Sequence, residues 1–215
     1  LALDTVGIQK AVWRGVGKAP VAPIAPNILY AIKDAKPHVQ DVEKAKKLLA
    51  EAGVKLPLNV QIWTNERKER IDMATIIQSQ LEEVGIKAEI KVLEWGAYLD
   101  GLKQKTHDMF ILGWVASVPD PEFAVSGVFH SSMAGSTNFS YFSNPEVDKM
   151  MEQGKALPNG PEREKLYKDL QEKIDSLKPW IYLHNDEQIC GTQKNVKGFQ
   201  PSPRGYHVLT NVSFE

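Results

Sequence analysis

The chain has 215 residues, of which 42% are hydrophobic and 25% are charged, a mixture typical of a globular protein with a sizeable core rather than of a disordered tail. Its 26 Lys and Arg residues nearly balance its 27 Asp and Glu residues, and no basic stripe runs along it, which disfavours nucleic acid as a partner. No apolar run approaches the ~18 residues of a membrane-spanning helix, and the single cysteine, Cys190, excludes an intramolecular disulfide and a Cys-rich zinc site.

The beginning of the chain carries neither an initiator Met nor a signal peptide. Residues 1–13 have apolar side chains at helical spacing and predict the last part of a helix that begins upstream, so we expect a fragment of a longer chain. Residues 15–37 are rich in Gly, Pro and Ala and predict an extended linker. The next helix is expected to begin after Asp41, which suits an N-cap, and to stop at Gly53.

Three strands and two helices are predicted to alternate in the next part of the chain. Apolar and polar residues alternate over 58–63 and 86–92, which is the period-2 pattern of strands. Apolar residues at helical spacing follow each strand, over 66–84 and over 94–103, and predict two helices. The apolar run 109–114 predicts a third strand that is buried on both faces. This order predicts an α/β fold with a central βαβαβ parallel sheet, right-handed crossovers and flanking helices.

The remainder of the chain is predicted to be more helical. Asn144 suits an N-cap with Pro145 at the first helical position, and Pro161 opens another helix. Residues 179–183 predict a strand, and short extended pieces are expected from there to Phe214.

The sequence contains no nucleophile elbow, zinc-protease motif, Cys-x-x-Cys pair or phosphate loop in its expected context. The five histidines do not pair with one another or with a cysteine at helical ligand spacing, so we expect no metal and no cofactor. An alternative to a binding protein is a hydrolase-like α/β enzyme domain that uses Asp120, Glu122 or His130 for acid–base chemistry. The local sequence favours a structural role instead, in which Asp120 caps a short helix that begins at Pro121.

A ligand is expected beyond the carboxyl ends of the parallel strands, where ligands collect in open sheets. Each of the three strand ends carries a tryptophan, namely Trp63, Trp95 and Trp114. Tryptophan offers a large flat contact at a low cost in side-chain entropy, which suits a binding pocket better than a catalytic centre. The alternative, that one or more of the three simply cap the core, stays open.

A series of short segments from residue 94 onward resembles a known family. Residues 94–99 read Glu-Trp-Gly-Ala-Tyr-Leu, residues 107–114 read His-Asp-Met-Phe-Ile-Leu-Gly-Trp, and Asp120-Pro121 follows. Further matching segments are Phe129-His130-Ser131-Ser132, Asn138-Phe139, Tyr141, Asn144-Pro145-Glu146-Val147-Asp148 and Asn195-Val196-Lys197-Gly198-Phe199. Together they resemble the second half of the oligopeptide- and dipeptide-binding proteins of ABC importers, bacterial extracellular solute-binding family 5. The resemblance covers essentially all 215 residues.

The resemblance implies a periplasmic-binding-protein-like type II fold, in which residues 1–215 are the C-terminal lobe and the N-terminal lobe is missing. Residues 1–20 and 188–215 would then be hinge or first-lobe elements. The implied function is that of a receptor, not an enzyme, which delivers a peptide or a small polar solute to the permease subunits of an ABC importer. The implied location is the periplasm or the extracellular side of a bacterial membrane, with a membrane anchor.

The resemblance also implies where ligand charges would be held. Family members place an Asp three residues after the tryptophan of a Gly-Trp pair to bind the peptide ammonium, and the corresponding residue here is Ser117. Dipeptide binders place an Arg at the end of the first strand to hold the carboxylate; an ungapped count reaches Thr64 here, with Arg67 three residues further on. Both positions depart from the family pattern. The expected ligand-binding residues are Trp63, Thr64, Trp95, Trp114 and Ser117.

Overall fold

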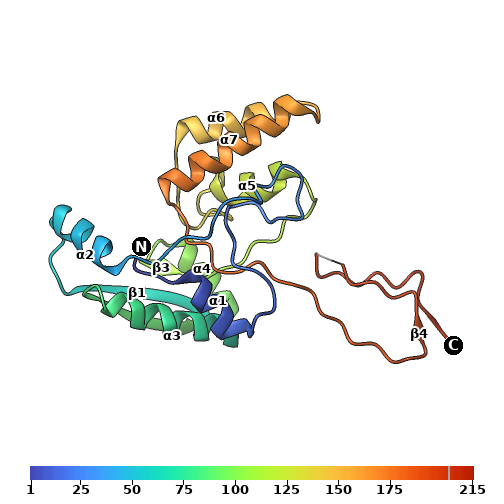
Figure 1. Ribbon diagram of the computed structural model, residues 1–215, viewed down its shortest axis with the longest axis horizontal. Helices are drawn as coiled ribbons and strands as arrows, with labels where there is room; N and C mark the ends of the chain where they lie inside the picture. The colour runs from blue at the N-terminus through green and yellow to red at the C-terminus, as the bar shows by residue number, and fades with distance from the viewer. Residues whose placement is uncertain (203) are drawn as a thin grey trace.

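The computed structural model describes residues 1–202 and 204–215 (Figure 1). Its first helix, α1 (Thr5–Trp13), begins inside the chain, because Asp4 caps it: the Asp4 Oδ1 atom accepts a hydrogen bond from the amide of Gly7 at 2.8 Å. The Asp4 carboxylate thereby takes the place of a preceding helical turn. The expectation that this helix begins upstream is therefore wrong, and residues 1–4 are not helical.

The linker and the second helix agree with the sequence. Residues 15–37 contain no helix or strand beyond one isolated bridging residue, as their proline-rich composition predicted. Helix α2 (Val42–Glu51) begins after Asp41, whose Oδ1 accepts a hydrogen bond from the amide of Lys44 at 2.9 Å. Gly53 follows the helix at a φ of 65°, the left-handed conformation that favours glycine.

The predicted parallel sheet is present. Its central strand is β1 (Leu58–Asn65), which pairs in parallel with β2 (Ile86–Leu93) on one side and with β3 (Met109–Phe110) on the other. The register runs from Leu58 opposite Ile86 to Asn65 opposite Leu93, so the two long strands end at the same edge. This confirms the βαβαβ order predicted from the hydrophobic pattern.

The two crossover helices pack against opposite sides of β1, because successive side chains of a strand point to opposite faces. Helix α3 (Lys68–Glu82) shares a core with Ile62 of β1. Helix α4 (Trp95–Lys103) packs on the neighbouring residue, Trp63, with Tyr98 and Leu102 in the same cluster. Gly101 of α4 permits this close approach, since a Cβ atom there would collide with the Trp63 ring.

The third strand is much shorter than predicted. The sequence indicated a strand over 109–114, but only Met109 and Phe110 form the ladder, and one further bond joins the Ile111 amide to the Trp63 carbonyl oxygen at 3.0 Å. The chain leaves the sheet beyond Ile111, although β1 continues for two residues after Trp63 and stays paired with β2 there. Residues 113–115 are exposed rather than buried on both faces.

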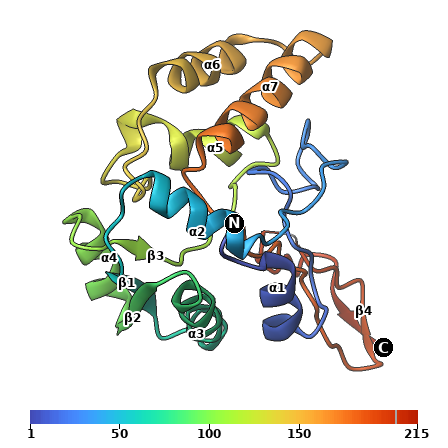
Figure 2. The same ribbon diagram turned by 60° about the vertical axis from the view of Figure 1, so that its left-hand side comes forward.

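A second layer consists of helices and lies on one side of the sheet layer (Figures 1 and 2). Its helices are α5 (Pro121–Phe129), the 3-10 turn η1 (Ser131–Met133), α6 (Pro145–Ala156) and α7 (Pro161–Leu177). The prolines at the starts of α6 and α7 confirm the predicted helix openings. The core of this layer contains fully buried side chains from α5, α6 and α7: Val125, Phe129, Val147, Tyr167, Leu170 and Ile174. Among the described residues, no helix is both long and apolar enough to cross a membrane.

The predicted strand over 179–183 does not form. Trp180 packs instead against Phe129 of α5, with ring centroids 4.5 Å apart, so side-chain packing rather than a strand neighbour holds this segment. Beyond it the chain makes one antiparallel bridge between Asn185 and Lys18.

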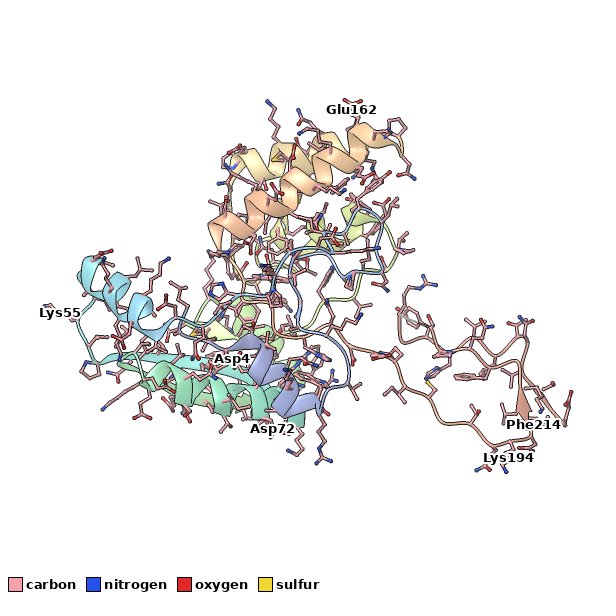
Figure 3. All side chains as sticks on the ribbon, in the orientation of Figure 1. Asp4, Lys55, Asp72, Glu162, Lys194 and Phe214 are labelled. Atoms are coloured by element: carbon pink, nitrogen blue, oxygen red, sulfur yellow. The ribbon has the colours of Figure 1, made fainter. Side chains whose placement is uncertain are left out.

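Residues 188–202 and 204–215, which we call the arm, extend away from the two layers (Figure 1). Two short strands, β4 (Val196–Lys197) and β5 (Ser213–Phe214), pair with each other as an antiparallel ladder within it. Lys194 and Phe214 lie at its far end, remote from Asp4 and from Glu162 (Figure 3). Most large apolar side chains of the arm are exposed: Ile189, Tyr206, Val208, Leu209 and Phe214.

Candidate functional site

The carboxyl ends of the three parallel strands form the edge where the sequence places a ligand. Asn65 ends β1 opposite Leu93, which ends β2, and the loop over 113–117 leaves the sheet just after β3. In open parallel sheets this edge is where binding groups from several strands converge. We call it the carboxyl edge.

Trp95 stands at the carboxyl edge at the start of α4 and is 46% exposed. Glu94 caps this helix, because its Oε2 atom accepts hydrogen bonds from the amides of Gly96 at 2.8 Å and Ala97 at 3.1 Å. These amides also lower the pKa of Glu94. The Trp95 ring is thus held on a capped helix start with much of its surface open to solvent.

Trp114 stands on the loop that follows β3 and is 41% exposed. Its indole Nε1 donates a hydrogen bond to the Phe123 carbonyl oxygen at 3.2 Å. Its ring lies against Gly127 of α5, where an added Cβ atom would come within 2.7 Å of the ring carbon Cζ2. Helix α5 therefore fixes the position of Trp114 while leaving a large part of it exposed.

The other two strand-end residues are buried. Trp63 is only 4% exposed, donates its Nε1 hydrogen to Gln61 Oε1 at 2.9 Å and carries the Lys91 ammonium 4.3 Å above its ring. Thr64 is fully buried, and its hydroxyl donates to the Asn65 carbonyl oxygen at 3.3 Å. In this structure Trp63 caps the core, the alternative that the sequence left open.

Ser117 is exposed near the end of the same loop as Trp114. Its carbonyl oxygen accepts a hydrogen bond from Nη1 of Arg204 at 2.9 Å, so the arm returns to the carboxyl edge at this point. The structure therefore brings Trp95, Trp114 and Ser117 to one exposed edge. Sequence reasoning had no signal for Arg204, which is 87 residues away along the chain.

Arg70 is a second cation that the sequence did not single out. It lies in the first turn of α3, its Nη1 donates to Asn65 Oδ1 at 2.9 Å, and its guanidinium carbon lies 5.8 Å from the centroid of the Trp95 ring. A helix that follows a parallel strand begins at the carboxyl edge of the sheet, so the position of Arg70 in the first turn of α3 could have identified it from the sequence. Arg67, the substitute suggested by sequence, is instead paired with Glu69 through its Nε atom at 3.0 Å.

Asp120 anchors the loop of the candidate site to the helical layer. Its Oδ1 accepts a hydrogen bond from the Glu122 amide at 2.9 Å, which confirms the predicted helix cap. The two Asp120 carboxylate oxygens also receive hydrogen bonds from Nη1 and Nη2 of Arg163, each at 2.8 Å. Arg163 thereby lowers the pKa of Asp120.

The acid–base set of the enzyme alternative is not brought together. Asp120 and His130 flank opposite ends of α5, and the Asp120 carboxylate is occupied by Arg163. His130 forms a local contact, in which its Nδ1 lies 2.8 Å from the hydroxyl of Ser132. General acid–base catalysis needs its groups within reach of one substrate, a condition that Asp120 and His130, at opposite ends of α5, do not meet.

A model of the bacterial extracellular solute-binding proteins, family 5 (middle part), matches residues 1–136. The chain belongs to this family. It is 30% identical over 223 residues to the dipeptide-binding protein of Escherichia coli K12, covering 100% of the chain and 41% of that protein. It is 31% identical over 221 residues to heme-binding protein A of Haemophilus influenzae, covering 100% of the chain and 40% of that protein.

A solved structure supports the fold of this family 5 chain. The dipeptide-binding protein from Pseudoalteromonas sp. SM9913, in complex with Met-Leu, superposes with a TM-score of 0.86 at 26% identity, covering 100% of this chain and 43% of that one. The parallel sheet with flanking helices is thus the periplasmic-binding-protein-like type II fold that the resemblance implied. The chain spans about two fifths of the length of these relatives.

Proposed function

We propose that residues 1–215 are one lobe of a two-lobed extracytoplasmic receptor, which binds a peptide or a small polar solute at the carboxyl edge. The observation that carries this proposal is the pair of tryptophans, Trp95 and Trp114, which are held by α4 and α5 yet remain 46% and 41% exposed. Rigid, exposed aromatic rings at a strand edge suit binding, because little entropy is lost when a ligand covers them.

Exposed apolar side chains around Trp114 suggest that this surface is covered in the longer protein. Val115, Val118 and Phe123 are 64%, 42% and 45% exposed and lie on the same loop and the helix that follows it. Contiguous exposed apolar side chains mark surfaces that a ligand or another part of a protein covers. We infer that ligand and second lobe cover this loop together.

The second lobe would come from the remainder of a longer chain. The relatives support this, because the whole of this chain aligns with only about two fifths of the length of each relative. Residues 1–20 and 188–215 are proposed as hinge or first-lobe elements. The bridge between Lys18 and Asn185 joins the first of these segments to the chain just before the second, and the exposed apolar side chains of the arm need a partner surface.

The mechanism we propose is hinge closure. Ligand binding between two lobes favours the closed state over the open state by the difference in its affinity for the two. The permease subunits of an ABC importer would recognise the closed state, in the periplasm or at the outer face of a bacterial membrane to which the receptor is anchored. The receptor would release its solute unchanged, since Asp120 serves as a helix cap and an ion-pair partner.

The test is to identify what the two-lobed receptor holds. The longer protein would be incubated with a synthetic pool of peptides of two to six residues, washed, denatured, and its released solutes identified by mass spectrometry. We expect a reproducible subset of the peptides, and a yield at least about tenfold lower from the variant Trp114→Ala, which loses a large aromatic contact.

A matched control is Leu48→Ala, which removes a similarly exposed apolar side chain on α2 away from the carboxyl edge. Its peptide yield should equal that of the wild type. Recovery of no peptide by the wild type would contradict the proposal for peptides, and an equal loss in both variants would contradict the placement of the site.

A further inference from the structure

The loop between α6 and α7 contains an asparagine followed directly by a glycine, Asn159-Gly160, and no other asparagine of the chain precedes a glycine. Asn159 is exposed, and Gly160 is the N-cap of α7. Asparagine is a thermolabile residue, and the glycine that follows it has no Cβ atom to shield its backbone nitrogen. The side-chain amide of Asn159 therefore has an unhindered nucleophile beside it in the chain.

The reaction that this pair permits is deamidation. The Gly160 nitrogen gives up its proton and forms a bond to Cγ of Asn159, while the bond from Cγ to Nδ2 breaks and the side-chain nitrogen takes up a proton and leaves as ammonia. Water then opens the cyclic imide at one or the other of its carbonyl groups, which gives aspartate or isoaspartate. Water is the only co-reactant, and no atom is oxidised or reduced.

Both reacting groups are held by hydrogen bonds in the folded chain. The Gly160 N–H donates to Oη of Tyr30 at 3.0 Å, and Oδ1 of Asn159 accepts from Nη1 of Arg163 at 2.7 Å. The Tyr30 hydroxyl also donates to Asn159 Oδ1 at 3.5 Å. A deprotonated Gly160 nitrogen would face the lone pairs of the phenol oxygen rather than water, so the contact with Tyr30 opposes the first step of the reaction.

Tyr30 is fixed in place by residues other than Asn159. Its φ of 61° lies in the left-handed region, which is uncommon for a side chain of this size. Its carbonyl oxygen accepts a hydrogen bond from Nε2 of Gln171 at 3.0 Å, and Oε1 of the same side chain accepts one from the Ile32 amide at 3.2 Å. Gln171 is fully buried on α7. It therefore holds the loop that presents the Tyr30 hydroxyl to the start of α7.

We propose that Asn159 is a deamidation site that the Tyr30 hydroxyl holds in check, so that Asn159 converts to aspartate or isoaspartate when this contact opens. The conversion affects the ion pair that anchors the loop of the candidate site to the helical layer. Arg163 binds Asp120 through Nη1 and Nη2 at 2.8 Å each, and an aspartate at position 159 brings a second carboxylate to Nη1. An isoaspartate instead adds a methylene group to the backbone directly before the N-cap of α7.

The experiment follows residue 159 over time in the folded wild type, Tyr30→Phe, Tyr141→Phe and Gly160→Ala. Each protein is incubated at mildly alkaline pH and then digested at acidic pH, and the aspartate and isoaspartate forms of the peptide that contains residue 159 are quantified by mass spectrometry. Thermal melting of each variant establishes that it is folded during the incubation.

Two of these variants are controls of different kinds. Tyr141→Phe is the matched control for Tyr30→Phe, because it removes a tyrosine hydroxyl that donates to the Lys103 carbonyl oxygen at 2.7 Å, at the end of α4. Gly160→Ala tests the identity of the attacking atom. The fold has room for this change, since the backbone of Gly160 is extended and no atom lies within 4 Å of an added Cβ.

We expect Asn159 to deamidate about fivefold faster in Tyr30→Phe than in the wild type, the change of about 1 kcal/mol that the loss of one hydrogen bond produces. Tyr141→Phe should deamidate at the wild-type rate. Gly160→Ala should react at least about tenfold more slowly, because a methyl group then shields the nitrogen. If Tyr30→Phe fails to fold, the wild type unfolded in urea replaces it, and its Asn159 should react at least about fivefold faster than in the folded state.

Three results would overturn the inference. Equal rates at Asn159 in the folded wild type and in folded Tyr30→Phe would show that the hydroxyl protects nothing, and the same acceleration in Tyr141→Phe would show that the effect is not specific to Tyr30. In the chain unfolded in urea, deamidation of Asn159 no faster than that of the other asparagines would show that the pair is not a preferred site.

Discussion

Replacing Arg163 with alanine should lower the free energy of unfolding by about 3 kcal/mol, at the low end of the cost of breaking a buried ion pair. The Arg163 side chain is 7% exposed, and it donates to Asp120, to the Gly154 carbonyl oxygen and to Asn159 Oδ1. Its removal leaves the Asp120 carboxylate without its cation. We expect the loss of stability to be at the low end of this range because Asp120 is 26% exposed, so water can solvate part of the carboxylate charge that Arg163 no longer neutralises. Urea denaturation of both proteins measures the difference.

The matched control is Lys168→Ala, which removes one member of an exposed helical pair with Glu164. Solvent screens such exposed pairs, so the control should change stability little. A loss below about 1 kcal/mol in Arg163→Ala would contradict the account of this ion pair.

The same ion pair should make the free energy of unfolding depend on pH in the acid range. Because Arg163 lowers the folded-state pKa of Asp120 below its ordinary value of 3.8, the pair stabilises the fold fully above that value. This contribution is lost as pH falls from about 3.8 through the lowered pKa. Asp120→Asn should therefore be less stable than the wild type at neutral pH and should lose less stability on acidification.

The second large effect concerns the separated lobe. The 215-residue chain alone should bind any peptide at least about 100-fold more weakly than the two-lobed receptor does, a difference of about 2.7 kcal/mol. Binding pockets normally bury ~70–90% of a small ligand, and one lobe supplies only part of that contact. Titration calorimetry of one recovered peptide against both proteins gives the two dissociation constants.

A suitable control for this comparison is the melting temperature of the separated chain, which establishes that it is folded when the titration is made. Submicromolar affinity of the folded chain for the peptide would show that one lobe encloses the ligand by itself. The proposed two-lobed site would then be wrong.

The sequence predicted those features that local chemistry decides. Asp41, Asp120 and Asn144 cap their helices because each needs only an amide two or three residues away. The alternating residues of β1 and β2 predicted two strands whose inner face is covered by α3. Their parallel pairing followed from the intervening helix, since parallel strands need a crossover.

The features that sequence reasoning missed depend on distant partners. The ladder of β3 stops at Phe110 although its neighbour β1 continues to Asn65, and the segment over 179–183 is held by the contact of Trp180 with Phe129. At the candidate site Trp63 is buried and Trp114 is exposed, although both are tryptophans at strand ends and look alike in the sequence. The return of Arg204 to Ser117 joins residues 87 apart, a separation that no local pattern encodes.

Hydroxyl-radical footprinting of the two-lobed receptor, with and without a recovered peptide, tests most directly whether the carboxyl edge holds the ligand. Trp95 and Trp114, now 46% and 41% exposed, should become several-fold less oxidised when peptide is bound. Trp63, already 4% exposed, should be protected in both states, and the exposed Leu48 on α2 should be unchanged. Undiminished oxidation of Trp95 and Trp114 at saturating peptide would contradict the account, because the ligand would then lie elsewhere.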